Sequence, residues 1–531
     1  MTTPTSPSRI LASIAVAAAL FSAAPAAIVA QQHDLDGLLE EVTTEVEANA
    51  KLVQVIVDNL FSFSELGFQE VETQRYLTAL LRENGFEVRD GVAEIPTAWW
   101  ATWGSGEPVI AFGSDIDGIP KSSQKPGVAY HDPIVEGAPG HGEGHNSGQA
   151  VNIVAALALK KIMEREQIPG TLVLWPGVAE ELVATKAWFV REGLLEGVDA
   201  VFFTHVGNNL GVSWGPASGT GLVSVEFTFA GEAAHSAGAP WRGRSALDAA
   251  MLMDIGWNFR REHLRPDQRS HSIISDGGDQ PNVVPSEASV WYYIREMDYP
   301  DIKRNFDVAV KMAEGASLMT DTEMSYQILG TAWPRHFNRV IAETMQQHIE
   351  KVGLPEWSEA DQQLARAVQE EVGSDPDGLA TELDSLRTPG ERRSGGSDDI
   401  GDISWVVPTV TFRFPSNIPG LPGHHWSNAI AMATPIAHKG ATAGAKVMAR
   451  TALEFFLTPK LVEDSWTYFR DVQTKDMEYT PFIGPDDPPA IWLNTSIMDE
   501  FKPQLEPFYF DETRFDNYLE QLGITYPTIR R

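Results

Sequence analysis

Cysteine is absent from the 531-residue sequence. Its absence excludes disulfide bonds, thiolate metal ligands and attachment of a lipid to an N-terminal cysteine. Basic residues are also scarce, because 40 lysines and arginines face 73 aspartates and glutamates, which gives a formal net charge of -33. Such an acidic chain disfavours nucleic acid and anionic membranes as partners. Beyond residue 30, no apolar run approaches the roughly 20 residues that a membrane-spanning helix needs.

The first 30 residues differ from the rest of the chain. Arg9 is the only charged side chain among them, and residues 10–30 are apolar and rich in alanine. This composition predicts a secretory signal peptide cleaved near Ala26 or Ala30, and therefore a secreted or periplasmic protein that contacts no membrane after cleavage. An uncleaved membrane anchor is the alternative. The alanine, serine and proline in the later half of the segment favour cleavage.

Four continuous apolar runs predict strands that are buried on both faces. They cover residues 108–114, 170–175, 198–204 and 408–414. Helical patterns lie between them, for example at residues 147–164 and at 180–192, where Glu180 and Glu181 are expected to begin the helix. Strands that alternate with helices predict an α/β domain with a mainly parallel sheet.

The pattern changes between residues 213 and 331. Residues 220–230 alternate between apolar and polar, which is typical of a sheet covered on one face. A helix, two strands, a helix and a strand follow, at 245–263, 272–275, 288–297, 301–314 and 323–329. This β-α-β-β-α-β order predicts a ferredoxin-like α+β unit inserted into the α/β domain.

These patterns divide the chain into five segments. They are a signal peptide (1–30), the first part of a catalytic domain (31–212), the inserted dimerisation or lid domain (213–331), the second part of the catalytic domain (332–458) and a C-terminal extension (459–531). We expect the extension to wrap irregularly over the catalytic domain.

Residues 140–146 read GHGEGHN and place His141, Glu143 and His145 at alternate positions between glycines. Imidazole and carboxylate groups are the usual ligands of a borderline divalent metal such as zinc. A solvated loop that happens to contain histidines is the alternative. Asn146 stands where the N-cap of the following helix is expected.

Further candidate ligands follow the predicted strands. In an open α/β sheet, ligands bind at the carboxyl ends of the strands. The candidates there are Asp115 and Asp117 after the first strand, Glu180 and Glu181 after the second, His205 after the third, and His424 beyond the loop after the fourth. Together with the GHGEGHN loop, five separate segments converge on one rim, which predicts a metal site in a cleft.

Each candidate also has a structural explanation. The two aspartates could belong to a solvated turn, and the paired glutamates could stabilise the first turn of a helix through its dipole. His205 could be a core histidine whose hydrogen bonds are satisfied. His141 and His425 are interpreted as neighbours of the ligands rather than ligands.

Nine motifs resemble those of the M20 family of metallopeptidases and amidohydrolases, over about residues 35–500. In chain order they read SELGFQE, GSDIDGIP, GHGEGHN, WPGVAEE, FFTHV, GEAAHSAGAPW, QPNVVP, GSDDIGDISW and GLPGHHW. The resemblance is greatest to the branch that contains the aminobenzoyl-glutamate hydrolases and the N-acyl-amino-acid amidohydrolases. It implies a hydrolase domain that binds two divalent metal ions, zinc with manganese or cobalt as alternatives, and an inserted ferredoxin-like dimerisation domain.

The resemblance also implies roles for individual residues. Glu180 would be the general base, and Asp117, with Asp115 beside it, would orient the ligands from behind. The implied metal ligands are Glu143, His145, Glu181, His205 and His424. Glu143 departs from the pattern, because this branch usually has a cysteine there. A carboxylate still bridges two ions, and it does not oxidise as a thiol does.

Three residues of the inserted domain complete the implied site. In the family, a histidine at the position of His235 holds the substrate carbonyl, often from the partner subunit, and Asn282 corresponds to a residue with similar substrate contact. Arg295 ends a strand and is a candidate for bidentate binding of a substrate carboxylate. An exposed loop histidine, a turn asparagine and a surface arginine are the alternative interpretations.

The function that follows is metal-dependent hydrolysis of the amide bond of an N-acyl or N-aroyl amino acid, with aminobenzoyl-glutamate as a representative small-molecule substrate. Two alternatives share the fold, a dipeptidase or carboxypeptidase and a catalytically silent binding protein. A periplasmic solute-binding protein is an alternative from another class. We expect a homodimer, with pairing to a different kind of chain as the alternative.

Overall fold

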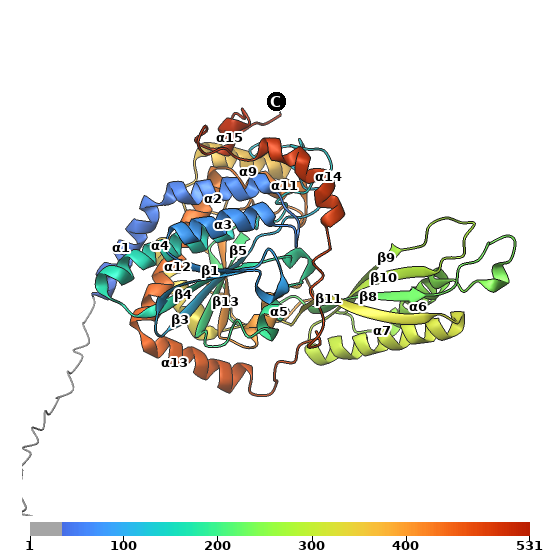
Figure 1. The fold of residues 1–531 in the computed structure, drawn as a ribbon. Helices are drawn as coiled ribbons and strands as arrows, with labels where there is room; N and C mark the ends of the chain where they lie inside the picture. The colour runs from blue at the N-terminus through green and yellow to red at the C-terminus, as the bar shows by residue number, and fades with distance from the viewer. Residues whose placement is uncertain (1–33, 531) are drawn as a thin grey trace, which may run out of the picture. The chain divides into compact units, whose positions relative to one another are not determined.

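The computed structural model describes residues 34–530, so the predicted signal peptide lies outside the described residues. A seven-stranded sheet forms the centre of the larger domain, in the order β1-β2-β4-β3-β5-β13-β6 (Figure 1). Neighbours among β4, β3, β5 and β13 are parallel, whereas β1, β2 and β6 pair antiparallel at the two edges. The strands are β1 (Glu87–Asp90), β2 (Trp99–Ser105), β3 (Val109–Asp115), β4 (Gly170–Gly177), β5 (Ala200–Gly207), β6 (Gly211–Val212) and β13 (Thr409–Pro415). The expected α/β architecture is confirmed.

Two alanine-rich helices, α4 (Gly148–Glu166) and α12 (Pro435–Leu457), pack against each other and against the central strands. Small side chains let these helices approach closely, so both are buried over most of their length. The N-terminus of α12 is as expected, since the Thr434 hydroxyl accepts a hydrogen bond from the amide of Ile436 and Pro435 occupies the first helical position. Trp175 of β4 stacks on Phe203 of β5 and meets the edge of Phe189 from α5 (Lys186–Arg191).

The remaining elements of the larger domain are mostly helices. They are α1 (Leu35–Ala48), α2 (Ala50–Phe63), α3 (Val71–Glu83), α8 (Arg339–Val352), α9 (Glu359–Glu371), α10 (Ile400–Ser404) and α11 (Trp426–Ala429), with the short strands β7 (Gly215–Pro216) and β12 (His336–Phe337) paired to each other. Within residues 34–530, no helix has the length and apolar character that crossing a membrane requires.

The inserted segment forms a second, four-stranded antiparallel sheet in the order β11-β8-β10-β9, with α6 and α7 packed against it (Figure 1). Its elements are β8 (Gly221–Ala230), α6 (Ala246–Arg260), β9 (Arg269–Asp276), β10 (Glu287–Glu296), α7 (Tyr299–Thr320) and β11 (Glu323–Ala332). The chain order and the strand order are those of a ferredoxin-like unit, as expected. Val223, Val225, Phe227 and Phe229 of β8 are all buried, which explains the alternating pattern.

The C-terminal extension is more regular than expected. It contains α13 (Pro459–Tyr468), α14 (Thr495–Leu505) and α15 (Tyr518–Gln521), so the expectation of an irregular wrap is wrong. Apolar residues at helical spacing, such as Met498 and Leu505, are buried and account for the helices. The extension contacts motifs around the site, because Asn494 donates a hydrogen bond to the carbonyl of Gly67 (3.0 Å) and Trp188 donates one to the carbonyl of Asp487 (3.0 Å).

Candidate metal centre

The GHGEGHN loop takes its shape from a glycine and an asparagine. Gly144 has φ +118°, and a Cβ at this position would lie 2.6 Å from the Met432 sulfur, so only glycine fits between Glu143 and His145. Asn146 is not the N-cap of α4, contrary to the expectation, because Ser147 occupies that position. The Asn146 amide instead donates to the carbonyls of Val57 (3.1 Å) and Met432 (2.8 Å). It thereby ties the loop to two distant segments.

The paired glutamates lie on a tight turn rather than on the expected helix. Residues Glu180–Leu182 form one turn of 3-10 helix, and α5 begins only at Lys186. Ala179 and Val183 flank the turn, each with φ 50°. A β-branched residue rarely adopts this left-handed conformation, and such strain clusters at functional sites. Gly67 of the SELGFQE motif makes room for the turn, since a Cβ there would lie 2.7 Å from Ala179 Cα.

The structure brings all five predicted metal ligands together. The two carboxylate oxygens of Glu143 face different histidines, with Oε1 3.4 Å from His205 Nε2 and Oε2 2.9 Å from His424 Nε2. Glu181 Oε2 lies 3.4 Å from the same nitrogen of His424. The rings of His145 and His205 are 5.3 Å apart, centroid to centroid. Glu143 is thus positioned as a carboxylate between two groups of ligands.

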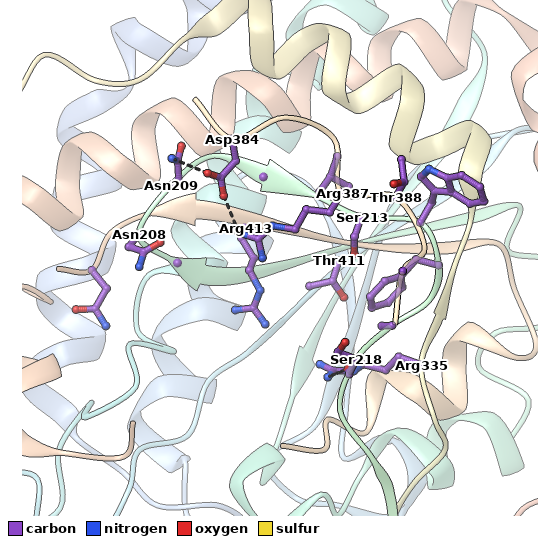
Figure 2. Close-up of a pocket in the computed structure, with 18 of the residues that line it drawn as sticks. Asn208, Asn209, Ser213, Ser218, Arg335, Asp384, Arg387, Thr388, Thr411 and Arg413 are labelled. Atoms are coloured by element: carbon purple, nitrogen blue, oxygen red, sulfur yellow. Dashed lines mark hydrogen bonds and ion pairs between the residues drawn. The ribbon is translucent and has the colours of Figure 1, made fainter. Parts of the chain in front are cut away.

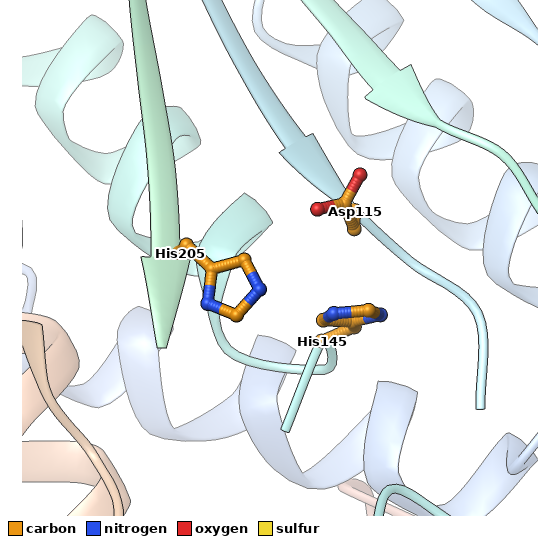
Figure 3. A group of neighbouring side chains, drawn as sticks. All are labelled: Asp115, His145 and His205. Carbon is orange, nitrogen blue, oxygen red and sulfur yellow. The ribbon is translucent and has the colours of Figure 1, made fainter. Parts of the chain in front are cut away.

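Two overlapping groups of side chains have the spacing of a metal site. Asp115, His145 and His205 form one group, shown in Figure 3, and Glu143, His145 and Glu181 form the other. In each group one candidate ligand atom per residue lies within 4.8 Å of the others. His145 belongs to both groups, so two ions bound here would be close neighbours.

Asp117 holds two of the ligands from behind. Its Oδ1 lies 3.3 Å from His145 Nδ1, and its Oδ2 accepts a hydrogen bond from the amide of Glu181 at 3.0 Å. A carboxylate on Nδ1 fixes the imidazole so that Nε2 faces the site. Asp115 has a different partner, since its Oδ1 is 2.7 Å from the ammonium of Lys186.

The site fits a divalent cation on two observations. His145 Nε2 and Glu181 Oε1 are buried and have no hydrogen-bond partner among the described residues, which is costly unless a ligand pairs with them. The site is also too negative by itself. Although burial opposes its charged form, the carboxylates of Asp117, Asp115 and Glu143 raise the pKa of His145 well above its ordinary value. A cation bound among these donors would balance that charge.

The pKa shifts of the three glutamates differ in direction. Burial opposes the ionisation of Glu143, but the imidazoles of His205 and His424 hold its pKa well below the ordinary value. Burial and the charge of Glu143 raise the pKa of Glu181. Burial, then Asp115 and Asp398, raise the pKa of Glu180, whose Oε2 lies 3.9 Å from His145 Nε2.

His141 and His425 have structural partners instead of ligand geometry. His141 is buried with Nε2 3.0 Å from the carbonyl of Leu60, and burial lowers its pKa to about 4, so it is a neutral core histidine. His425 accepts the amide of Ser427 at the start of α11. His424, in contrast, has φ 47° and a side chain that is 64% exposed, so it is a ligand at the open side of the cluster.

The three predicted substrate-binding residues lie in two places. Arg295 of β10 reaches the catalytic domain, because it donates to the hydroxyl of Ser397 (2.9 Å), and the charge of Glu180 influences its pKa. His235 and Asn282 are exposed in adjacent loops of the inserted domain, joined by a bond from Ser236 N to the carbonyl of Asn282. Within residues 34–530, neither side chain forms a hydrogen bond or ion pair with the metal-ligand cluster.

Sequence reasoning missed a buried ionic cluster behind the glutamates and a buried arginine. Lys186 is fully buried, lies 2.7 Å from Asp115 and contacts Asp399, with Asp398 3.9 Å away. Arg413 lies 2.9 Å from His205 Nδ1. The available signal was a charged residue inside an apolar segment, in VATKAWF and in VTFRF, which is rare without a partner or a function.

Glu65 in the SELGFQE motif should make stability depend on pH. It is buried, and burial raises its pKa to about 7 although the amides of Glu72 and Thr73 donate to it. Because the folded state holds this proton more tightly than the unfolded chain, its stabilisation is complete below pH 4.5 and is lost as the pH rises through about 7. The slope is about 1.4 kcal/mol per pH unit between these values. We expect Glu65→Gln to flatten the fall in melting temperature over this range.

The control for that measurement is the exposed Glu87, and Glu87→Gln should leave the pH profile of the wild-type protein unchanged. If Glu65→Gln also leaves the profile unchanged, the raised pKa of Glu65 is wrong.

The fold and the ligand cluster together define a metallohydrolase. Residues 219–318 match the M20 peptidase dimerisation domain. One of the chains of the p-aminobenzoyl-glutamate hydrolase of Escherichia coli strain K12 is 32% identical over 454 residues, which are 79% of this chain and 92% of that protein. The Xaa-Arg dipeptidase of Mus musculus is 26% identical over 81% of this chain and 91% of that protein.

Among solved structures, the aminobenzoyl-glutamate utilization protein of Klebsiella pneumoniae aligns with a TM-score of 0.52 at 18% identity, over 80% of this chain and 98% of that one. The chain belongs to the M20 family of metallopeptidases and amidohydrolases. It is a hydrolase with a site for divalent metal.

Proposed function

We propose that the protein hydrolyses the amide bond of N-acyl or N-aroyl amino acids, releasing a carboxylic acid and an amino acid. The observation that carries this proposal is the position of Glu180. Its carboxylate is next in sequence to the ligand Glu181 and 3.9 Å from Nε2 of His145, so a proton acceptor lies at the edge of the ligand cluster. The relation to the p-aminobenzoyl-glutamate hydrolase of Escherichia coli supports an aromatic acyl group and an acidic amino acid.

In the proposed mechanism Glu143, His145, Glu181, His205 and His424 hold the metal. A divalent ion supplies Lewis acidity, which lowers the pKa of water from 15.7 to about 7. Glu180 accepts the proton of the attacking water and returns it to the leaving nitrogen. Its raised pKa brings the carboxyl group toward the range in which it takes up and releases a proton at neutral pH. Asp117 keeps His145 and Glu181 oriented throughout.

We further propose two ions per site, zinc with manganese or cobalt as alternatives. The two carboxylate oxygens of Glu143, facing His205 and His424 separately, support a bridging role. Carboxylate in place of thiolate favours harder ions than a cysteine would, so manganese and cobalt are the informative alternatives to test.

A homodimer is part of the proposal. Met251, Ile255 and Phe259 are 51%, 48% and 76% exposed, and their spacing of four places them on one face of α6. The edge strand β9 adds exposed Ile273 and Ile274. A second copy that covers this surface would bury both features. His235 would then serve the oxyanion of the other copy's site, with Asn282 beside the substrate.

Export to the periplasm or beyond the cell is also proposed, from the composition of residues 1–30 alone. Fusion of these residues to a reporter enzyme that is active only outside the cytoplasm tests it. An inactive fusion with normal expression would reject export.

The alternative within the family is a dipeptidase, which the relation to Xaa-Arg dipeptidase supports. A substrate panel separates the two proposals. We expect metal-loaded protein to hydrolyse p-aminobenzoyl-glutamate and benzoyl amino acids faster than dipeptides, because the proposed acyl group is aromatic. Chelation should abolish hydrolysis, and zinc, manganese or cobalt should restore it. Preference for dipeptides would select the alternative, and activity that survives complete metal removal would reject both.

A further inference from the structure

A cavity of about 670 Å³ lies beside the metal centre (Figure 2). The loop after β5, the β13 residues Thr411 and Arg413, and the segment 384–392 contribute to its wall. Four arginines line it, Arg335, Arg387, Arg392 and Arg413, against two carboxylates, Asp384 and Glu391. In a chain of net charge -33, a wall with an excess of positive charge is a specific local feature that attracts an anion.

The four arginines are not equally neutralised. Arg387 pairs with Asp384 at 2.6 Å, Arg392 with Asp298 at 2.7 Å and Arg335 with Asp398 at 3.5 Å. Arg413 is half-buried and, among residues 34–530, no carboxylate lies within 4.0 Å of its guanidinium. Burial and the nearby Arg335 lower its pKa. A buried cation without a counter-ion is costly, and a bound anion would remove that cost.

Neutral groups of the wall also lack partners. Thr411 Oγ1 and Asn209 Oδ1 are buried without a hydrogen bond among the described residues. Both residues line the cavity. The Thr411 hydroxyl can donate to an anion, so it adds a neutral donor to the charged ones.

Arg413 connects the cavity to the metal centre. It is opposite His205 in the parallel pairing of β13 and β5. Its Nη1 lies 2.9 Å from His205 Nδ1 and donates to the carbonyl of Val206 at 2.9 Å. The other ring nitrogen of His205 faces Glu143. One imidazole therefore separates the ligand cluster from the arginine-lined cavity.

We propose that this cavity binds a carboxylate of a small organic anion, with Arg413 as the main contact and Arg387 and Thr411 as further contacts. The guanidinium groups suit a carboxylate because both are planar and pair through two hydrogen bonds. Two sources offer this chemistry. One is the side-chain carboxylate of an acidic amino acid in the substrate, which rests on the proposed function, and the other is a free dicarboxylate that binds separately.

The first experiment measures binding and needs no activity. Glutarate is titrated calorimetrically into the metal-loaded full-length protein, its Arg413→Met and Arg387→Met variants, and the control Arg165→Met. Arg165 pairs with Glu41 on the surface and does not line the cavity. We expect affinity to fall roughly 10-fold to 100-fold for Arg413→Met, the range for loss of a charged hydrogen bond, and less for Arg387→Met. The control should bind as the wild type does.

Arg387 keeps the test decisive, because it does not touch a metal ligand, and metal content measured by mass spectrometry shows whether Arg413→Met has disturbed the ions. If both variants bind glutarate within twofold of the wild type, the proposal is overturned, whether the anion binds the metals or nowhere.

The second experiment separates the two sources by comparing kcat/KM for benzoyl-glutamate and benzoyl-alanine. If the substrate supplies the carboxylate, Arg387→Met raises KM for benzoyl-glutamate and leaves benzoyl-alanine unchanged. If a free dicarboxylate is the ligand, glutarate binding weakens while the ratio of the two substrates stays constant. A protein that binds glutarate through these arginines but hydrolyses neither amide would refute the proposed function and leave the anion site standing.

Discussion

Replacing Glu180 by glutamine is expected to lower kcat by about 10³-fold to 10⁴-fold, the contribution of a well-placed general base. Glutamine keeps the size and hydrogen-bonding reach of the side chain but cannot accept the proton. The metal content should not change, because Glu181, and not Glu180, lies within 3.4 Å of His424. Steady-state kinetics and metal analysis by mass spectrometry on the same preparation measure both quantities.

The matched control is Glu192→Gln, which changes an exposed glutamate just after α5. It should retain wild-type kcat. Turnover of Glu180→Gln within tenfold of the wild type would remove the assignment of Glu180 as the base, since no other role explains a carboxylate at that position in the proposed mechanism.

Replacing Lys186 by methionine should cost the folded protein about 3–5 kcal/mol. The ammonium of Lys186 is the buried counter-ion of Asp115, 2.7 Å away, and of Asp399. Methionine fills a similar volume but leaves these carboxylates buried without a positive partner. For a chain of this length the loss corresponds to a melting temperature lower by roughly 3–5 °C, measurable by circular dichroism or calorimetry.

Lys161 provides the comparison, because it pairs with Glu45 at the surface, where an ion pair contributes only about 0–1 kcal/mol. Lys161→Met should therefore melt within about 1 °C of the wild type. Adding Asp399→Asn to Lys186→Met should restore part of the lost stability, because it removes one of the uncompensated charges. Equal melting temperatures for Lys186→Met and Lys161→Met would show that the buried cluster does not stabilise the fold in this way.

Sequence patterns were most informative where residues are buried by regular elements. Continuous apolar runs predicted β3, β4, β5 and β13, and alternation predicted β8, because these patterns depend only on which face of a strand meets the core. The rule that ligands lie at the carboxyl ends of strands predicted which segments would meet. It could be applied without knowing any loop conformation, and the structure brings those segments together.

Patterns failed where tertiary contacts decide local structure. Glu180 and Glu181 have the composition of a helix start, but Ala179 and Val183 adopt left-handed conformations, fixed by packing against Gly67, and the helix is broken. Asn146 has the residue type of an N-cap, yet its amide serves carbonyls 89 and 286 residues away. Partners so distant in sequence leave no local signal.

The charged groups around the site show the same limit. Lys186 and Arg413 each stand out as a charge in an apolar segment, but their partners, Asp399 and His205, are 213 and 208 residues away. The sequence therefore indicated that such residues need an explanation without supplying it. The roles of His235 and Asn282 stay predictions, because both lie in exposed loops whose contacts depend on a second copy of the chain.

The most direct test of the account is the metal content of the purified protein after loading with zinc and removal of the excess. The five clustered side chains predict about two ions per chain, with loss of at least one ion in His424→Ala and in Glu143→Ala. His425→Ala, which changes the neighbouring histidine that caps α11, should keep the wild-type content. A wild-type protein that retains no divalent metal, or His424→Ala and Glu143→Ala proteins that retain as much as His425→Ala, would contradict the claim that these residues form a metal centre.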